Sequence, residues 1–203
     1  MKRKVSRVYE HDAQDTNGKT LFLYTDGSDL KHSKNRQIGG GAVFVYDGKV
    51  ATCGWTFTRE DVIRLVGLPP AFQGLFSNPT AEMLAAAFAL LESYDLHPRL
   101  QFKKVVVLSD YIQVFEYGRA KYRRPSFHKG YGSTAIYQKS VCLFLDAIKL
   151  CKDKGIAVEV RHVRAHSGVE YNELADKLAK QGVDAPNTVL ETFSKYFNRT
   201  PIL

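Results

Sequence analysis

The sequence predicts an α/β fold in which helices flank a mixed five-stranded sheet, made of a three-strand antiparallel meander plus two parallel strands. Two patterns predict this fold. Three apolar, β-branched stretches follow one another near the start with only a loop and a turn between them, which is typical of a meander. Two later stretches of this kind each follow a segment with apolar residues at helical spacing, which favours parallel pairing. A chain of 203 residues, 44% of them apolar, suffices for one such domain.

The meander is predicted from the first apolar stretches. Leu21–Thr25 is apolar, aromatic and β-branched and stops at Asp26, so we expect a buried strand there. The polar, glycine-rich stretch Asp29–Gly41 is predicted to be a loop. An Asp-Gly pair separates the strands predicted at Ala42–Tyr46 and Lys49–Ala51, which indicates a tight hairpin.

The middle of the chain is predicted to hold an irregular excursion, a helix and the fourth strand. Thr58–Pro79 contains one short helical piece among several glycines and prolines. Thr80–Tyr94 carries an apolar stripe at helical spacing, with Thr80 as its N-cap. Val105–Leu108 is a continuous β-branched and apolar run just before Asp110, as expected of a strand covered on both faces.

The last elements are predicted to be a helix at Tyr137–Asp153, a strand at Ala157–Val163 and a helix at Glu170–Gln181. Glycines at 155 and 182 suit the ends of the two helices. We therefore expect one domain over residues 20–183, a flexible leader over residues 1–19 and a C-terminal extension over residues 184–203.

Composition narrows the classes of protein. The formal net charge of +8 favours a polyanionic partner such as nucleic acid, although a solvated cationic surface explains it equally well. The three cysteines are odd in number and far apart, which argues against a disulfide framework or a zinc site. We expect an intracellular, reducing compartment, cytoplasm or nucleus, with an organelle left open by the basic N-terminus. We expect no membrane partner, because no stretch is apolar enough to span a bilayer.

Four acidic residues stand where the pattern changes, and they are Asp26, Glu82, Asp110 and Asp176. Asp26 and Asp110 follow predicted strands, and such strand ends gather functional groups if the strands are neighbours. Clustered carboxylates repel one another unless a divalent cation neutralises them, and oxygen ligands select Mg²⁺ or Mn²⁺. Taken singly, each acid also has an ordinary explanation, as a turn residue, a charge at a helix N-terminus or a solvated position.

Four motifs surround these acids, in the order YTDGS at 24–28, NPTAE at 78–82, LSD at 108–110 and HSGVEYNELAD at 166–176. They resemble the motifs of type 1 ribonuclease H, in the ribonuclease H-like superfamily, and the last is the most specific. The resemblance implies an endonuclease that hydrolyses the RNA strand of RNA–DNA hybrids and leaves 5′-phosphate and 3′-hydroxyl ends. It also implies that the four acids bind two Mg²⁺ ions, for which Mn²⁺ can substitute, and that His166 assists proton transfer or product release.

The resemblance further implies contacts with the hybrid. Proteins distinguish RNA from DNA by the 2′-hydroxyl and by minor-groove shape, which small polar groups and exposed backbone can recognise. The family places such groups near the cut strand, and the matching residues are Gly27, Ser28, Asn78 and Asn172. Asn78 has the alternative explanation of a turn residue before Pro79.

A basic segment at residues 117–131 contains no acid and alternates cations with aromatic residues. It resembles the basic handle that some family members place against the DNA strand, and its predicted contacts are Lys121, Arg123 and Arg124. Cations attract the phosphate backbone, and aromatic rings can stack on bases. A charged run of this kind is otherwise a solvated face.

The sequence departs from the family pattern at Tyr111, where a small hydroxyl residue or asparagine is usual, at Pro79, and in a long insert at residues 58–77. These departures concern substrate contacts rather than the acids. Two other interpretations remain: a non-catalytic module that binds or scaffolds hybrids, and a related nuclease that acts on DNA junctions. Incubation with a hybrid and with DNA distinguishes them. We expect a monomer.

Overall fold

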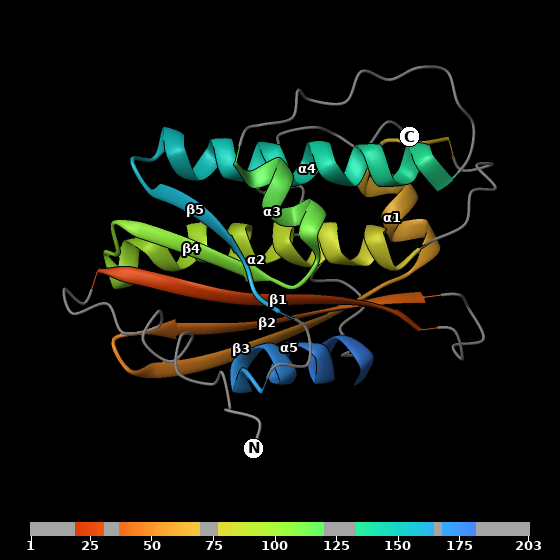
Figure 1. Ribbon diagram of the computed structural model, residues 1–203. Helices are drawn as coiled ribbons and strands as arrows, with labels where there is room; N and C mark the ends of the chain where they lie inside the picture. Colours follow the sequence, from red (N-terminus) through yellow and green to blue (C-terminus); the bar gives the residue numbers. More distant parts are fainter. Residues whose placement is uncertain (1–18, 31–36, 70–76, 120–132, 165–167, 182–203) are drawn as a thin grey trace.

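The computed structural model describes residues 19–30, 37–69, 77–119, 133–164 and 168–181. Figure 1 shows how the elements of these residues are arranged. The strands are β1 (Thr20–Leu30), β2 (Gln37–Tyr46), β3 (Lys49–Phe57), β4 (Lys104–Ser109) and β5 (Ala157–His162). The helices are α1 (Arg59–Leu65), α2 (Asn78–Leu100), α3 (Ile112–Gly118), α4 (Ser133–Asp153) and α5 (Glu170–Gln181).

The sheet is mixed, with the strand order β3-β2-β1-β4-β5. β1, β2 and β3 form an antiparallel meander, whereas β4 pairs in parallel with both β1 and β5. The predicted fold class is confirmed. In the parallel pair, Thr25 of β1 stands opposite Ser109 of β4. Asp26 directly follows Thr25 in the sequence, and Asp110 directly follows Ser109. The register of β1 and β4 therefore brings the two acids together.

Helices cover both faces of the sheet (Figure 1). Alternate residues of β1 point to opposite faces, as the strand period of two requires. Leu23 faces the larger core, which the sheet forms with α1, α2 and α4, and is fully buried. Tyr24 faces the smaller core beneath α5, where its ring centroid lies 5.4 Å from that of Tyr171. The sheet is therefore the middle layer of three.

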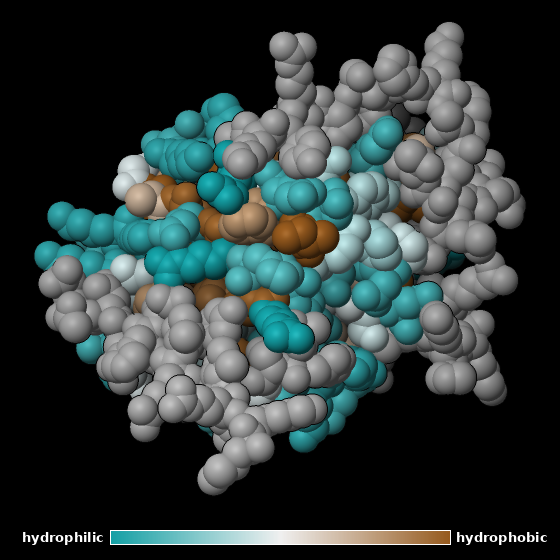
Figure 2. Space-filling view, in the orientation of Figure 1, coloured by the Kyte–Doolittle hydropathy of each residue, from teal (hydrophilic) through white to brown (hydrophobic). Residues whose placement is uncertain are grey.

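Hydrophilic side chains cover most of the described part of the face in Figure 2, and apolar side chains show between them near its centre. Single exposed apolar side chains are ordinary on protein surfaces. Among the residues that the structure describes, no helix combines the length and the apolar character needed to cross a membrane.

The prediction of a loop over Asp29–Gly41 is wrong at both ends of this range. β1 continues to Leu30, and β2 begins at Gln37. Asp26 therefore lies inside β1, where it pairs with Gly41 of β2, rather than after the strand. The third predicted strand is also longer than expected, because β3 runs to Phe57.

The glycines that suggested a loop lie inside β2 and allow a close approach of α5. A Cβ atom on Gly39 would lie 1.9 Å from the carbonyl oxygen of Ala179, and one on Gly41 would lie 2.2 Å from that of Ala175. Glycine within a strand commonly marks such an approach of another backbone. The contact holds α5, and with it Asp176, against the sheet.

Helix α2 begins earlier and ends later than predicted, at Asn78 and Leu100. Ser77 occupies the N-cap position, so the predicted cap at Thr80 is wrong. The Thr80 hydroxyl instead lies 3.2 Å from that of Ser77. This start places Glu82 just beyond the first turn of the helix.

The predicted irregular excursion contains helix α1, and its residues 70–76 lie outside the described residues. The helix begins with a capping box in which Thr58 and Asp61 satisfy one another's backbone N–H groups. Val62 and Leu65 are buried, so α1 contributes to the core. Helix α3 was not predicted. It is only seven residues long, and Val114 is its one buried residue.

Candidate active site

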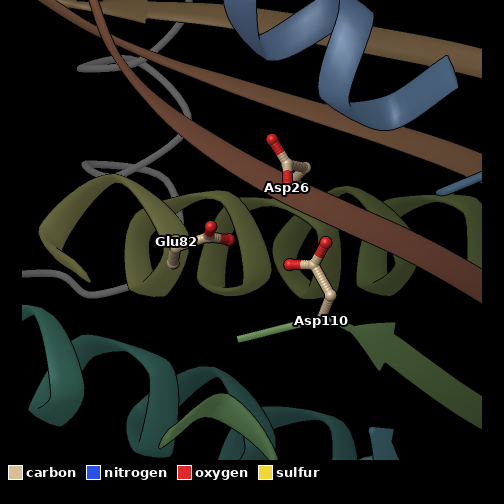
Figure 3. A group of neighbouring side chains, drawn as sticks. All are labelled: Asp26, Glu82 and Asp110. Carbon is tan, nitrogen blue, oxygen red and sulfur yellow. The ribbon is translucent and has the colours of Figure 1, made fainter. Parts of the chain in front are cut away.

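Three of the four predicted acids meet beside the sheet (Figure 3). Asp26 comes from β1, Glu82 from α2, and Asp110 directly follows β4. One carboxylate oxygen of each residue lies within 4.8 Å of one from each of the others. Asp26 and Glu82 are buried, and Asp110 is partly exposed. The three carboxylates are therefore close enough to share a cation.

The cluster lies in a pocket of about 270 Å³. Asp176 lines the same pocket from α5, but it is not one of the three clustered acids. The carboxylate of Asp176 accepts a hydrogen bond of 2.7 Å from the Nζ atom of Lys180. The complete lining is Asp26, Gly27, Ser28, Asn78, Glu82, Asp110, Asn172, Glu173, Asp176 and Lys180. The pocket thus gathers the four acids with the four small residues predicted to contact substrate.

Burial and mutual repulsion disfavour the charged forms of the two buried acids. Burial raises the pKa of Asp26 from 3.8 to about 7, with further raising by the charges of Asp110 and Asp176. Lys180 opposes this rise in the pKa of Asp26. The pKa of Glu82 is raised well above 4.5, first by burial and then by the charge of Asp26. A bound cation would relieve this repulsion and favour the charged forms.

Hydrogen bonds hold Glu82 and connect it to β1. The backbone N–H of Gly27 donates to Glu82 Oε2 at 3.0 Å, and Asn78 Nδ2 lies 3.5 Å from Glu82 Oε1. Asn78 Oδ1 in turn accepts a bond of 3.1 Å from the backbone N–H of Asp29. Asn78 therefore bridges the start of α2 and β1, and the alternative that it is only a turn residue is wrong.

Asp110 is held from α5 and from β5. Asn172 donates from Nδ2 to Asp110 Oδ2 at 3.2 Å, which connects α5 to the acid cluster. The Nε2 atom of His162 lies 3.0 Å from the backbone carbonyl oxygen of Asp110. Sequence reasoning gave His162 no role, and its position at the end of a strand carries no signal of one.

The structure leaves four predicted site residues outside the residues it describes: His166, Lys121, Arg123 and Arg124. Their roles stay predictions. Sequence reasoning missed two pocket residues, Glu173 and Lys180. They lie three residues before and four residues after Asp176, and residues with these spacings share a helix face. Their spacing from Asp176 is therefore the sequence feature that could have identified them as pocket residues.

The donor atoms of the pocket fit a hard divalent cation. Clustered carboxylate oxygens are the ligands that Mg²⁺ and Mn²⁺ prefer in proteins. Asn172 adds a further acceptor, because it is only 4% exposed and its Oδ1 atom has no hydrogen-bond partner among the described residues. Buried acceptors in excess of donors indicate a site that takes a cation or a donor-rich ligand.

A mixed sheet of this order, with carboxylates converging from β1, β4 and α2, defines a protein of the ribonuclease H-like superfamily. The RNase H family model matches residues 18–184, and the chain belongs to that family. Family membership supports a nuclease that hydrolyses RNA in RNA–DNA hybrids. No curated protein sequence matches the chain.

Solved structures share the fold. RNase H1 from the halophilic archaeon Halobacterium salinarum NRC-1 is 20% identical, with a TM-score of 0.50 over 81% of this chain and 98% of that one. The N-terminal RNase H domain of Rv2228c from Mycobacterium tuberculosis is 18% identical, with a TM-score of 0.51 over 85% and 97%. LC11-RNase H1, solved with an RNA/DNA hybrid, is 16% identical, with a TM-score of 0.54 over 81% and 96%.

Proposed function

We propose that the protein is an endonuclease that cuts the RNA strand of RNA–DNA hybrids by two-metal-ion hydrolysis and leaves 5′-phosphate and 3′-hydroxyl ends. The observation that carries the proposal is the convergence of Asp26, Glu82 and Asp110, with Asp176 in the same pocket. Membership of the RNase H family and the solved complex of LC11-RNase H1 with an RNA/DNA hybrid support this substrate.

The four acids are the proposed ligands of two Mg²⁺ ions, for which Mn²⁺ can substitute. When bound, such a pair supplies Lewis-acid activation of the attacking water and stabilisation of the leaving oxygen. The protein fixes the ligands beforehand. Gly27 and Asn78 hold the Glu82 carboxylate, and Asn172 holds that of Asp110. Preorganised ligands spare the cost of ordering these side chains during the reaction.

Recognition of the RNA strand is proposed for the small residues of the pocket. Gly27, Ser28, Asn78 and Asn172 line it beside the acids. Hydroxyl, amide and backbone groups suit the 2′-hydroxyl, which both donates and accepts hydrogen bonds. Ser28 is partly exposed and therefore accessible to a nucleic acid strand.

The test is incubation of the protein with Mg²⁺ and an RNA–DNA hybrid labelled on either strand. We expect fragments of the RNA strand only. Ligation and phosphatase treatment should then identify 5′-phosphate ends on these fragments. Chelation of the metal should stop the reaction. Asp47→Asn is the matched control for acid-to-amide variants, because Asp47 is exposed in the β2–β3 turn. Asparagine also tolerates the positive φ of 49° found there.

Two alternative functions are outcomes of the same experiment. Tight binding of the hybrid without cleavage in Mg²⁺ or Mn²⁺ would favour a scaffold. Cleavage of DNA junctions or DNA duplexes would favour the related DNA nuclease. A scaffold has no need of a buried acid cluster with raised pKa values, so the acid cluster argues against it.

Replacement of Asn172 by Ala should lower kcat by about 10- to 100-fold, because groups that orient metal ligands typically contribute this much. The lost group is the amide that holds Asp110. Steady-state hydrolysis across a Mg²⁺ titration is the measurement, with Lys177→Ala on the exposed side of α5 as control. An unchanged kcat at saturating Mg²⁺ would show that Asp110 needs no such support.

Replacement of His166 by Ala should lower turnover more than hybrid affinity, because the proposed role is proton transfer or product release rather than binding. An imidazole has an unperturbed pKa near 6.5, which suits proton transfer near neutral pH. Separate measurements of kcat and of the hybrid dissociation constant test this prediction. An equal loss in both quantities would count against the proposed role.

Neutralisation of Arg123 and Arg124 should raise the Michaelis constant and flatten its dependence on salt. With fewer phosphate contacts, binding of the hybrid releases fewer counterions. The control neutralises Lys49 and Lys103, a change that removes the same amount of positive charge. Both are exposed near the strand ends remote from Asp26. Michaelis constants at several salt concentrations are the readout, and an unchanged slope would place the basic segment away from the substrate.

A further inference from the structure

Helix α5 brings a lysine into the carboxylate pocket. Lys180 lines the pocket, and its Nζ atom donates to Asp176 Oδ2 at 2.7 Å across one turn of the helix. The side chains are 58% and 28% exposed, respectively. Exposed pairs of this kind add little to stability. The importance of Lys180 therefore lies in the position of its ammonium group among the pocket acids, and not in the strength of the ion pair.

The pocket also places Lys180 near an acid from another element. Lys180 lines the same pocket as Asp26 of β1 and Asp176 of α5. One side chain thus places a positive charge near acids of both β1 and α5. A divalent ion near these two acids would meet the electrostatic repulsion of that charge.

We propose that Lys180 is a resident counter-cation that competes with divalent metal ions for Asp176. Asp176 joins a metal site only when its hydrogen bond to Lys180 opens. Lys180 therefore raises the metal concentration at which the complete site fills. The inference rests on the proposed function, because it concerns metal binding by the same acids.

The test is calorimetric titration of the full chain with Mn²⁺, without nucleic acid. Lys180→Met removes the charge and keeps an unbranched side chain. We expect this variant to bind Mn²⁺ about three- to tenfold more tightly than the wild type, as loss of one nearby like charge predicts. The matched control is Lys177→Met, since Lys177 is exposed on the same helix and does not line the pocket. Screening should keep its effect below about twofold.

A second pair of variants tests whether the lysine acts through Asp176. In the Asp176→Asn background, Lys180→Met should give a smaller gain in Mn²⁺ affinity than in the wild type, because the contested ligand is absent. A gain of equal size in both backgrounds would overturn the proposal. Equal Mn²⁺ affinities of Lys180→Met and Lys177→Met, or a loss of affinity in Lys180→Met, would overturn it as well.

Failure of the proposed function has a different signature. If Asp26→Asn binds Mn²⁺ as the wild type does, the acids are not the metal ligands, and both proposals fall. If the wild type binds Mn²⁺ but leaves hybrids intact, the nuclease proposal falls. In that case, tighter binding by Lys180→Met still supports competition for Asp176.

Discussion

Replacement of Asp26 by Asn should abolish hydrolysis of the hybrid while leaving the protein folded. We expect kcat to fall at least about a thousandfold, which corresponds to ~4 kcal/mol of lost transition-state stabilisation. Asp26 is one of three acids whose carboxylate oxygens lie within 4.8 Å of one another, so its loss removes a ligand from the proposed site. An amide keeps the shape of the side chain and removes the charge that a cation requires. Hybrid affinity should change much less, because the rest of the pocket remains.

The same substitution should stabilise the protein when no metal is bound, and the effect depends on pH. The pKa of Asp26 is about 7 in the folded protein, against 3.8 for an ordinary aspartate. Between these pH values, the Asp26 carboxyl is ionised in the unfolded chain and protonated in the folded protein, so stability falls as pH rises. Below pH 3.8 both states are protonated, and above pH 7 the whole cost of ionisation is present.

Asp26→Asn avoids this cost, so urea unfolding in the presence of a chelator should show a gain of about 4 kcal/mol at pH 8. The gain should shrink towards zero as pH falls to about 4. Mg²⁺ should stabilise the wild type more than the variant at pH 8, because ligands stabilise the state that binds them. Asp47→Asn should show neither effect. Equal stability of wild type and Asp26→Asn at pH 8 would mean that burial and the neighbouring carboxylates do not disfavour the charged form of Asp26 in the folded protein.

From the sequence, we expected Asp26 and Asp110 to lie side by side only if the strands before them are neighbours. Two β-branched runs that end just before Asp26 and Asp110 suffice to place these acids together, provided that their strands are parallel neighbours. The register of β1 and β4 meets that condition. Glu82 and Asp176 are different, because helical periodicity shows that they lie on helices but not where those helices pack. Only the order of motifs resembling those of ribonuclease H connected them to the site.

The wrong prediction of a loop over residues 29–41 has a clear physical source. Glycine was taken as a sign of a loop at Gly39 and Gly41, where the close approach of α5 to β2 leaves no room for a side chain. Local sequence cannot distinguish these two uses, because both depend on the absence of a side chain. The same limit applies to Lys180, whose sequence neighbours suggest only a solvated helix face. Its position in the pocket is a consequence of how α5 meets the sheet.

Gly27→Ala should have a large effect on the fold, and it tests the contact that positions Glu82. A Cβ atom at this position would lie 2.1 Å from the backbone nitrogen of Glu82 and 2.2 Å from the carbonyl carbon of Ala81. Backbone atoms cannot turn aside as a flexible side chain can, so α2 must move away from β1. We expect a loss of about 2–4 kcal/mol in the free energy of unfolding, the upper part of the range for overpacking.

The displacement should also disable the site in the molecules that remain folded. Gly27 donates its backbone N–H to Glu82 Oε2 at 3.0 Å, and movement of α2 breaks this bond and separates Glu82 from Asp26. Hydrolysis and Mn²⁺ affinity, measured at a temperature where circular dichroism shows a folded protein, should therefore both fall. Gly48→Asn is the control, because an added Cβ there meets nothing within 4 Å and asparagine accepts its φ of 68°. Wild-type stability and activity in Gly27→Ala would show that β1 and α2 have room between them, and that the acid cluster does not depend on their close approach.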